Sequence, residues 1–210
     1  MNLEIKKTDA LKQITQFQTI TKSQIKSLED FVILLLQENH QFNFIGKSTV
    51  TDIWNRHILD SAQLLQFIDN KNAKFADFGT GAGFPGMVLS ILGLKEVHLI
   101  EKAFRKCEFL RKSKLFSPNR IFVHQSKLEE LDKVTFDCIM SRALAPLDKL
   151  LGYCQNFLKD DGYCLFLKGK NLNQELEEAQ KQFQFTYTTH PSLTSDESKI
   201  IKISKIKKLC

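Results

Sequence analysis

Three glycines at alternate positions, next to a carboxylate, form the segment of this sequence whose residue types could most readily hold a ligand. The segment reads Asp77-Phe78-Gly79-Thr80-Gly81-Ala82-Gly83-Phe84-Pro85-Gly86. Glycines leave no Cβ atoms in the way, so a ligand can lie against bare backbone. The spacing from Gly81 to Gly86 also matches the fingerprint of dinucleotide-binding folds, which is weak by itself. We therefore expect a ligand-binding turn with cofactor contacts at Asp77, Gly79, Gly81 and Gly83.

Two cofactors suit such a turn, and the carboxylate discriminates between them. S-adenosylmethionine (AdoMet) carries a cationic ammonium and a sulfonium, whereas NAD carries an anionic pyrophosphate. Asp77, at the end of an apolar run, suits the ammonium and would repel a pyrophosphate, so it favours AdoMet. Glu101 ends the next apolar run, about twenty residues after Gly81. It could accept the hydroxyls of an adenosine ribose, as it could in either cofactor site.

Other residues with useful chemistry follow the later apolar runs. Leu128 and Glu129 could hold an adenine edge, Arg142 could contact a substrate or the AdoMet carboxylate, and Lys168 could add positive field. Ligands of open α/β sheets bind outside the carboxyl ends of the strands, so these residues are expected at one edge of the sheet. The alternatives are an acidic helix surface for Glu129 and a structural ion pair for Arg142.

Basic residues elsewhere are compatible with a second, anionic ligand. Arg56 and His57 share a predicted helix with Asp60. They either face a substrate phosphate or base, or belong to a surface ion pair. Arg105 and Lys106 lie in a basic helix that is either a phosphate-contacting face or an ordinary solvated one. The net charge of +6 permits a polyanionic partner without proving one.

Several other chemistries find no support in the sequence. The five histidines are scattered without paired spacing, so we expect no metal site, and no Gly-x-Ser-x-Gly elbow is present. The five cysteines lack CxxC spacing, and the N-terminus lacks an apolar signal core, which predicts reduced thiols in a cytoplasmic protein. The longest apolar stretch, residues 31–36, is too short to span a bilayer, so no membrane partner is expected.

From Lys74 onward, apolar runs of strand length alternate with segments of helical periodicity. This alternation predicts an α/β fold, with a mostly parallel sheet and helices on both faces. Two final runs with no helix between them predict a hairpin and hence one antiparallel strand. The predicted strands are 74–78, 97–101, 120–124, 136–140, 162–167, 185–188 and 199–203; the predicted helices follow Pro85 and span 103–115, 127–131, 147–157 and 171–182.

The first 72 residues lack strand character. Their apolar residues recur at intervals of three and four, which predicts two or three helices, the last near residues 50–68. We therefore divide the chain into an N-terminal helical cap, residues 1–72, and an AdoMet-binding α/β domain, residues 73–210.

Taken together, these residues resemble the bacterial 16S ribosomal RNA guanine-N7 methyltransferases, the glucose-inhibited division protein B family. The resemblance runs from about residue 43 to residue 170. It implies a Rossmann-like class I methyltransferase with a seven-stranded sheet. It rests on Asn43-Phe44, on residues 56–61, on the glycine turn, on Glu101 with Arg105-Lys106, on Ser141-Arg142-Ala143 and on Leu167-Lys168-Gly169.

The resemblance also implies site residues and a reaction. Guanine N7 has a lone pair and no proton to remove, so no general base is required, and Arg142 would act by positioning substrate or cofactor. The target, in 16S RNA or the 30S particle, is expected to be an unpaired base near Phe44, Phe84 and Arg142. Lys127 stands where the family has arginine and keeps the charge without the planar fork. The implied AdoMet contacts are Gly79, Phe84, Leu128, Glu129 and Arg142.

Three other functions share part of this pattern. A small-molecule methyltransferase would share the AdoMet site but would lack the steep salt dependence that phosphate contacts produce. A NAD-dependent dehydrogenase would share the glycine turn and would be stabilised against heat by NAD instead of AdoMet. An RNA-binding module without activity would share the basic residues and would transfer no methyl group.

Overall fold

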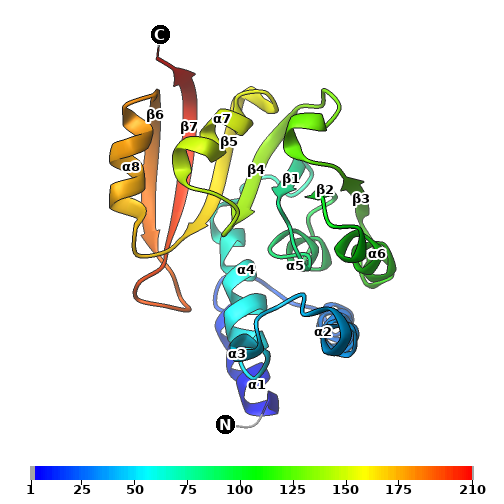
Figure 1. Cartoon of the computed structure of the whole chain (residues 1–210). Coiled ribbons are helices and arrows are strands. Elements are labelled where there is room, and N and C mark those ends of the chain that lie inside the picture. The colour runs from blue at the N-terminus through cyan, green and yellow to red at the C-terminus, as the bar shows by residue number, and fades with distance from the viewer. Residues whose placement is uncertain (1–2, 210) are drawn as a thin grey trace.

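A β-sheet of seven strands forms the centre of the structure, a computed structural model in which residues 3–209 are described (Figure 1). The strands begin and end close to the predicted positions, although β5 starts four residues earlier and both hairpin strands are longer. They are β1 (Lys74–Phe78), β2 (Glu96–Glu101), β3 (Arg120–Gln125), β4 (Phe136–Arg142), β5 (Leu158–Lys168), β6 (Phe183–Pro191) and β7 (Lys199–Lys208).

The strand order is β3-β2-β1-β4-β5-β7-β6. Strands β1 to β5 pair in parallel, and β7 runs antiparallel to both of its neighbours. The predicted fold class, a mostly parallel seven-stranded sheet with one antiparallel strand, is therefore confirmed. Since the chain reverses its direction of winding between β1 and β4, the ends of these strands form the crevice where such sheets bind ligands.

Helices cover both faces of the sheet, and the N-terminal helices gather at the end toward which β4 points (Figure 1). The helices are α1 (Leu3–Ile14), α2 (Lys22–Phe42), α3 (Lys47–Val50), α4 (Asp60–Ala62), α5 (Gly86–Ile91), α6 (Phe104–Ser113), α7 (Leu147–Cys154) and α8 (Leu172–Gln180). Shorter 3-10 turns occur at Gln63–Phe67, Lys114–Phe116 and Leu128–Glu130.

The predicted helix near residues 50–68 is wrong as one regular element. A π-helical turn, Trp54–Leu59, precedes α4, and the 3-10 turn Gln63–Phe67 follows it. Within this stretch the Ser61 hydroxyl donates to the His57 carbonyl at 2.7 Å, a bond that competes with the backbone ladder. Isolated π-helical turns are rare and often mark functional sites. This one carries Arg56 and His57 to the ends of the strands.

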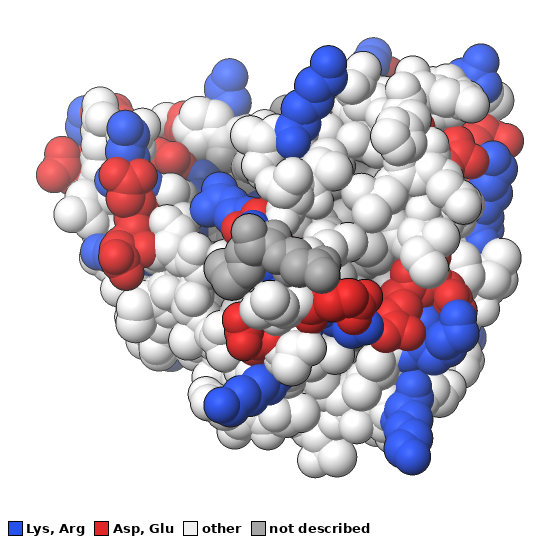
Figure 2. All heavy atoms as spheres, turned by 90° about the horizontal axis from the view of Figure 1, so that it is seen from below, with Lys and Arg blue, Asp and Glu red and all other residues white. Residues whose placement is uncertain are grey.

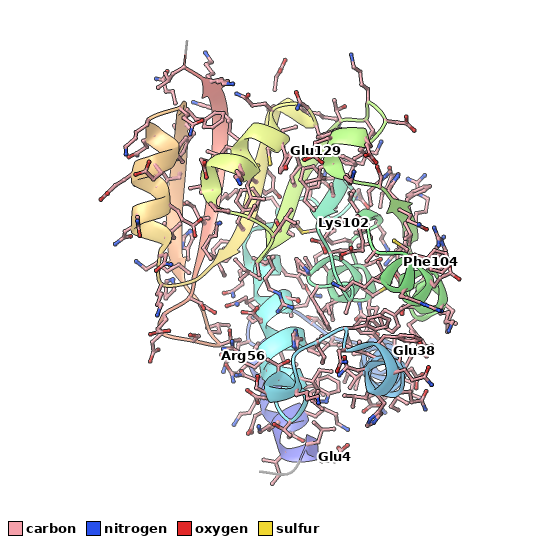
Figure 3. The ribbon with its side chains drawn as sticks, in the orientation of Figure 1. Glu4, Glu38, Arg56, Lys102, Phe104 and Glu129 are labelled. Atoms are coloured by element: carbon pink, nitrogen blue, oxygen red, sulfur yellow. The ribbon has the colours of Figure 1, made fainter. Side chains whose placement is uncertain are left out.

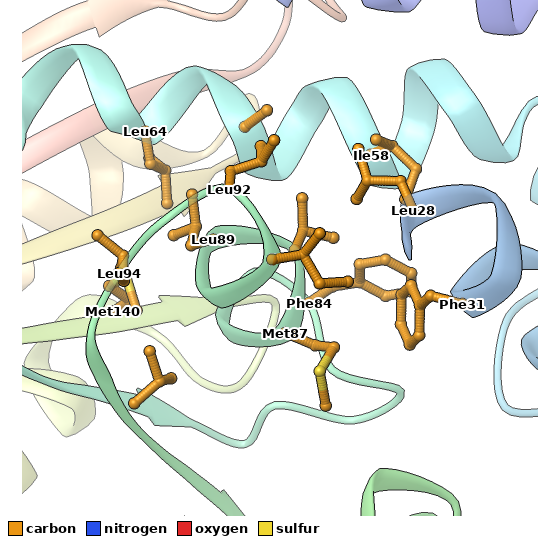
Figure 4. Packing of buried hydrophobic residues seen from close by; sticks show 14 of the residues in the cluster. Leu28, Phe31, Ile58, Leu64, Phe84, Met87, Leu89, Leu92, Leu94 and Met140 are labelled. Atoms are coloured by element: carbon orange, nitrogen blue, oxygen red, sulfur yellow. The ribbon is translucent and has the colours of Figure 1, made fainter. Parts of the chain in front are cut away.

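One hydrophobic core joins the N-terminal helices to the sheet. Helix α2 begins at a capping box, in which the Thr21 hydroxyl accepts from the Gln24 backbone N–H at 3.1 Å. Its apolar face then buries Phe31 against Phe84 and Phe109, with ring centroids 5.6 and 5.9 Å apart (Figure 4). Side chains from both sides of residue 72 thus pack together. The division into a cap and an α/β domain stays a prediction.

Residues 3–209 contain neither a membrane-spanning helix nor a cluster of metal-binding side chains. No helix in that range is long and apolar enough to cross a bilayer. No group of three or more His, Cys, Asp or Glu side chains in the same range could hold a metal ion. Four cysteines, Cys107, Cys138, Cys154 and Cys164, are buried free thiols.

Gly83 makes the close packing under the glycine turn possible. Its φ is +94°, and a Cβ there would lie 2.8 Å from Met87 Cβ and 3.2 Å from Leu110 Cδ2. We predict that Gly83→Ala lowers the free energy of unfolding by roughly 3 kcal/mol, because backbone strain adds to overpacking. Urea unfolding measures the change.

Gly152→Ala is the matched control for this prediction. Gly152 lies inside α7, and a Cβ there would meet nothing closer than Phe183 Cζ at 3.9 Å. Alanine should stabilise this helix by about 0.5–1 kcal/mol. Equal effects of the two substitutions would contradict the packing role of Gly83.

Candidate active site

The glycine turn after β1 is shaped for the close approach of other groups. Gly79 and Gly81 have φ values of +68° and +60°, in the left-handed region. The Gly79 N–H donates to the Ile100 carbonyl at 3.0 Å, which fixes the turn against β2. A Cβ at Gly79 would lie 2.5 Å from Leu144 Cδ1, so only glycine lets the segment after β4 approach the turn.

Asp77 holds the glycine turn from beneath. Its side chain is fully buried, and Oδ2 accepts from Thr80 Oγ1 at 2.6 Å and from the Gly86 N–H at 2.8 Å. Burial raises the pKa of Asp77 to about 6, against the opposing effect of these two bonds. The predicted direct contact with a ligand ammonium is therefore wrong. Asp77 can favour a cation above the turn through its field, and Oδ1 has no partner among the described residues.

A cleft of about 510 Å³ opens above the turn, and we call it the glycine cleft. Gly79 and Glu101 line one part of it, and Leu128 and Glu129 line another. Its volume lies in the range usual for small-molecule sites. Lys106 also lines this cleft, and its Nζ would lie 4.0 Å from a Cβ built on Gly81.

Glu101 is the acid best placed to receive hydroxyl donors in the glycine cleft. It is 8% exposed, and its Oε2 and Oε1 accept from the backbone N–H groups of Gly81 and Ala103 at 3.1 and 2.8 Å. An ionised carboxylate has about four acceptor positions, so capacity remains for a ribose.

The opposite part of the glycine cleft combines apolar and polar groups. Leu128 contributes apolar surface, and the Tyr153 hydroxyl donates to Glu129 Oε1 at 2.7 Å, a bond that lowers the pKa of Glu129. Bare backbone, a buried acid and an apolar wall together suit AdoMet. Gly79, Glu101, Leu128 and Glu129 are thus brought together as predicted, whereas their contacts with a cofactor stay a prediction.

A second pocket, of about 560 Å³, lies over the ends of β4 and β5, and we call it the Arg142 pocket. The segment Ala143–Ala145 lines both this pocket and the glycine cleft, so it forms a shared wall. Ala143 has a φ of +53°, which is uncommon for a residue other than glycine and often occurs at functional sites. Figure 3 shows Arg56 on one side of the β4 end, with Lys102 and Glu129 on the other.

Arg142 ties the end of β4 to the N-terminal helices. Its Nη1 donates to the Arg56 carbonyl at 3.0 Å and to Asp60 Oδ2 at 3.1 Å, and its Nη2 donates to His57 Nδ1 at 2.8 Å. The guanidinium also lies over the Phe84 ring, 5.2 Å from the centroid. Arg142 lines the Arg142 pocket, not the glycine cleft where the resemblance implies it.

His57 bonds to Arg142 and lines the Arg142 pocket beside it. Because arginine only donates, His57 Nδ1 must accept, so the ring proton resides on Nε2 and is donated to Thr49 Oγ1 at 2.9 Å. Burial, helped by the charges of Arg142 and Arg56, lowers the pKa of His57 to about 3. A neutral, 7% exposed imidazole offers no charge to a phosphate, but His57 lines the Arg142 pocket, so its predicted contact with RNA stays a prediction.

Asp60 and Arg56 do not form the surface ion pair considered from the sequence. Asp60 pairs with Arg142, and its Oδ1 accepts from Gln63 Nε2 at 3.0 Å and from Thr194 Oγ1 at 2.7 Å. Thr194 belongs to the loop between β6 and β7, so the C-terminal hairpin is fastened here too. Arg56 is exposed and makes no ion pair within the described residues, which leaves its charge available to an anion.

Lys168 was predicted to add positive field to the site as a candidate for RNA, and the structure shows that it also has a role inside the protein. It is 8% exposed, pairs with Glu175 and donates to the Ala145 carbonyl at 2.8 Å. This ammonium braces the shared wall from below. Its charge is already paired with Glu175, which weakens the predicted positive field, and because Lys168 lines the Arg142 pocket its contact with RNA stays a prediction.

The aromatic and basic residues that were predicted to contact RNA do not lie together in one pocket. Phe84 is 3% exposed, with its ring between Phe31, His57 and Arg142, so it is not an open stacking surface. Phe44 packs on Phe109 with centroids 5.2 Å apart.

Arg105, on α6, lies over the ring of Phe42 from α2 and lines neither the glycine cleft nor the Arg142 pocket. Lys106, its neighbour on α6, does line the glycine cleft.

Three residues of this region were not predicted. Leu144 directly follows the Ser-Arg-Ala motif and could have been found by extending it. Glu175 reads as an ordinary helix acid and Thr194 as part of a polar loop, so no local signal marks them. Their places depend on tertiary contacts.

The low pKa of His57 makes stability depend on pH. The ordinary value is 6.5, so between about 6.5 and 3 the folded state binds fewer protons than the unfolded state. The contribution of His57 to the free energy of unfolding is fully present above pH 6.5. As the pH falls through this range, that contribution decreases by up to about 1.4 kcal/mol per pH unit. In His57→Gln, the amide can accept from Arg142 and donate to Thr49. We predict that, when the pH is lowered from 7 to 5, the free energy of unfolding of this variant decreases by about 2 kcal/mol less than that of the wild type.

Urea unfolding at the two pH values measures this difference. His40→Gln, at an exposed position of α2, is the control and should follow the wild type. If the free energy of unfolding of His57→Gln depended on pH as strongly as that of the wild type, His57 would not be held neutral by burial in the folded state.

Proteins of known name are similar to this chain over most of its length. A protein of Rickettsia felis named ribosomal RNA small subunit methyltransferase G is 41% identical over 88% of this chain and 95% of its own. A protein of the same name from Paramagnetospirillum magneticum is 36% identical over 89% and 91%.

Solved methyltransferase structures share the fold at lower identity. A ribosomal protein L11 methylase from Lactobacillus delbrueckii has a TM-score of 0.58 and 20% identity, covering 70% of this chain and 76% of that one. TYW2 from M. jannaschii, in complex with AdoMet, has a TM-score of 0.56 and 17% identity, covering 75% and 78%. The family model described as rRNA small subunit methyltransferase G matches residues 24–203, and the chain belongs to this family.

Proposed function

We propose that this protein transfers a methyl group from AdoMet to N7 of one guanine in small-subunit 16S ribosomal RNA, as free RNA or within the 30S particle. The observation that carries the proposal is the pair of pockets at the carboxyl ends of the strands, which share the wall Ala143–Ala145. A transfer reaction needs donor and acceptor in contact, and pockets that share lining residues are neighbours, so the reacting groups would meet where the two pockets join beside Ala143–Ala145. A ribosomal substrate also agrees with the predicted cytoplasmic location.

The glycine cleft is the place that suits the cofactor. Gly79 would offer bare backbone, Glu101 would accept from the ribose, and Leu128 with Glu129 would border the adenine. The cofactor supplies an electrophilic methyl group on a sulfonium. The negative field of Asp77 beneath the turn would favour the cationic end of the same molecule.

The Arg142 pocket suits a flipped or unpaired base. Single bases stack on guanidinium planes as well as on aromatic rings, and Arg142 is held in one orientation by three hydrogen bonds. Its side chain keeps 20% of its surface exposed. Exposed Arg56 at the same pocket would meet a neighbouring phosphate.

Positioning is the main task that the chemistry leaves to the protein. The N7 lone pair is free in neutral guanine, so no residue must remove a proton before the transfer. Fixing the base against the shared wall and excluding water then supply the rate enhancement. A neutral His57 agrees with this, because its lone pair is already engaged by Arg142.

The charge distribution favours local contacts over one broad basic field. Figure 2 shows Lys and Arg side chains interspersed with Asp and Glu on the face seen from below. Lys102, Lys106 and Lys149 border the glycine cleft, and they make no ion pair within residues 3–209. With Arg56, these lysines are our candidates for phosphate contacts.

Methyl transfer to unmodified particles tests the proposal. Small-subunit particles from a strain that lacks this activity are incubated with protein and labelled AdoMet, and the labelled nucleotide is mapped. We expect one 7-methylguanine in 16S RNA. Label in a small metabolite instead of RNA would support a small-molecule methyltransferase, and no transfer at all would contradict the proposal.

Substitution of Arg142 tests the role of the Arg142 pocket. We predict that Arg142→Ala lowers kcat/KM on particles by at least about 100-fold and lowers stability by about 1–3 kcal/mol, because Asp60 and His57 lose their donor. Arg142→Lys should recover stability more than activity, since lysine keeps the charge and lacks the fork.

Arg120→Ala is the control for Arg142. Arg120 is paired with Glu96 at the opposite ends of the strands and should leave turnover unchanged. Wild-type turnover by Arg142→Ala would exclude Arg142 from the site.

A further inference from the structure

The Arg142 pocket contains two carboxylates, and they differ in how fully their oxygens are bonded. Asp60 has both oxygens engaged: Oδ2 by Arg142, and Oδ1 by Gln63 and Thr194. Glu175, from α8, lines the same pocket. Its Oε2 accepts from the Leu147 N–H at 2.9 Å and from Lys168. No donor within residues 3–209 bonds its other oxygen, Oε1.

Glu175 is also held firmly in place. Its side chain is 23% exposed, whereas that of its partner Lys168 is 7% exposed. Lys168 in turn donates to the Ala145 carbonyl in the shared wall. Because Oε2 is fixed by two donors, Oε1 has a defined position. A pre-positioned acceptor can discriminate between ligands more sharply than a mobile one.

The order of the strands places Glu175 on the opposite side of the shared wall from the glycine cleft. The glycine cleft is lined from the ends of β1, β2 and β3 and from α7. In contrast, β5 lies beyond β4, and Glu175 of α8 lines the Arg142 pocket and not the glycine cleft, so it lies on the other side of the shared wall. A purine whose N7 faces this wall points its six-membered ring away from the glycine cleft. N1 and C2, the atoms farthest from N7, then lie toward Glu175.

Guanine carries two donors at that far edge, N1–H and the 2-amino group, and a carboxylate accepts from both. Adenine presents a bare N1 acceptor and no amino group at C2. A carboxylate would therefore favour guanine and repel adenine at this position. Methylation of N7 also places a positive charge on the purine, which a nearby carboxylate stabilises.

We propose that Glu175 reads the N1–H and the 2-amino group of the target guanine and thereby sets the base specificity of the enzyme. This inference rests on the proposed function and extends it to a residue that shows no sequence signal. Lys168 is its positioning partner, since it holds Oε2 and leaves Oε1 for the base.

Inosine, which is guanosine without the 2-amino group, is the probe that tests this. Particles are reconstituted from 16S RNA that is ligated to carry either guanosine or inosine at the mapped methylation position. We expect the wild type to show a kcat/KM at least about tenfold lower on inosine, the usual effect of losing one charge-assisted hydrogen bond. Inosine keeps N7, so the chemistry of the transfer is unchanged.

Glu175→Gln should abolish this discrimination. The two donors at Oε2 will hold the amide oxygen, so the amide NH₂ takes the place of Oε1 and faces the donors of guanine. We expect activity on guanosine to fall at least about tenfold and the guanosine-to-inosine ratio to fall to within about twofold of one. A ratio that stays at the wild-type value would overturn the proposal.

Two further variants separate reading of the base from a structural role. Lys168→Met breaks the same ion pair but keeps the carboxylate, so it should retain a guanosine-to-inosine ratio of at least about five even if its activity and melting temperature fall. Glu177→Gln makes the same change on the exposed face of α8 and should match the wild type. Loss of discrimination in Lys168→Met equal to that in Glu175→Gln would assign the effect to the brace and overturn the proposal.

The design also distinguishes this inference from the proposed function. If the wild type transfers no methyl group to guanosine particles, the proposed function fails. If the wild type methylates guanosine and inosine equally, the function stands and the role of Glu175 fails.

Discussion

The ion pair between Arg142 and Asp60 is the contact on which the rest of the site depends. It joins the end of β4 to the N-terminal helical segment, and Asp60 extends the connection to Thr194 in the loop between β6 and β7. Three parts of the chain that are distant in sequence thus meet at one ion pair. Both side chains are largely shielded, so the pair is screened less than an ordinary surface salt bridge.

The shared wall follows from the same contact. Directly after Arg142 the chain leaves β4, and Ala143 adopts a left-handed conformation at that point. Leu144 then lies on Gly79, and the Ala145 carbonyl is held by Lys168. A turn that is held at both ends can separate two pockets with only three residues, Ala143–Ala145. Under the proposed function, this close spacing would place the base of an RNA next to the cofactor.

The elements were more predictable from sequence than the roles of the side chains. Strand β1 agrees with its predicted span because a buried apolar run followed by glycines allows few alternatives. The glycine turn, Glu101, Leu128 and Glu129 meet at one cleft because parallel strands end at one edge. Those are consequences of local pattern and topology.

The remaining roles could not be predicted because they depend on partners far away in the sequence. His57, Lys168 and Phe84 all turn inward, and each is paired by a group from another element. The irregular helix around Trp54–Leu59 likewise reflects a side chain that competes with the backbone. From the sequence, Glu175 looks like an ordinary acidic residue of an amphipathic helix. Only the tertiary structure shows that it lines a pocket.

A crystal structure with S-adenosylhomocysteine, the product of methyl transfer, tests the central claim most directly. The account predicts that the ligand occupies the glycine cleft, with its ribose hydroxyls on Glu101, its adenine beside Leu128 and its sulfur toward the shared wall. The Arg142 pocket should remain open on the other side of Leu144. Ligand density in the Arg142 pocket, or an empty glycine cleft at saturating concentration, would contradict the division of the site into a donor side and an acceptor side.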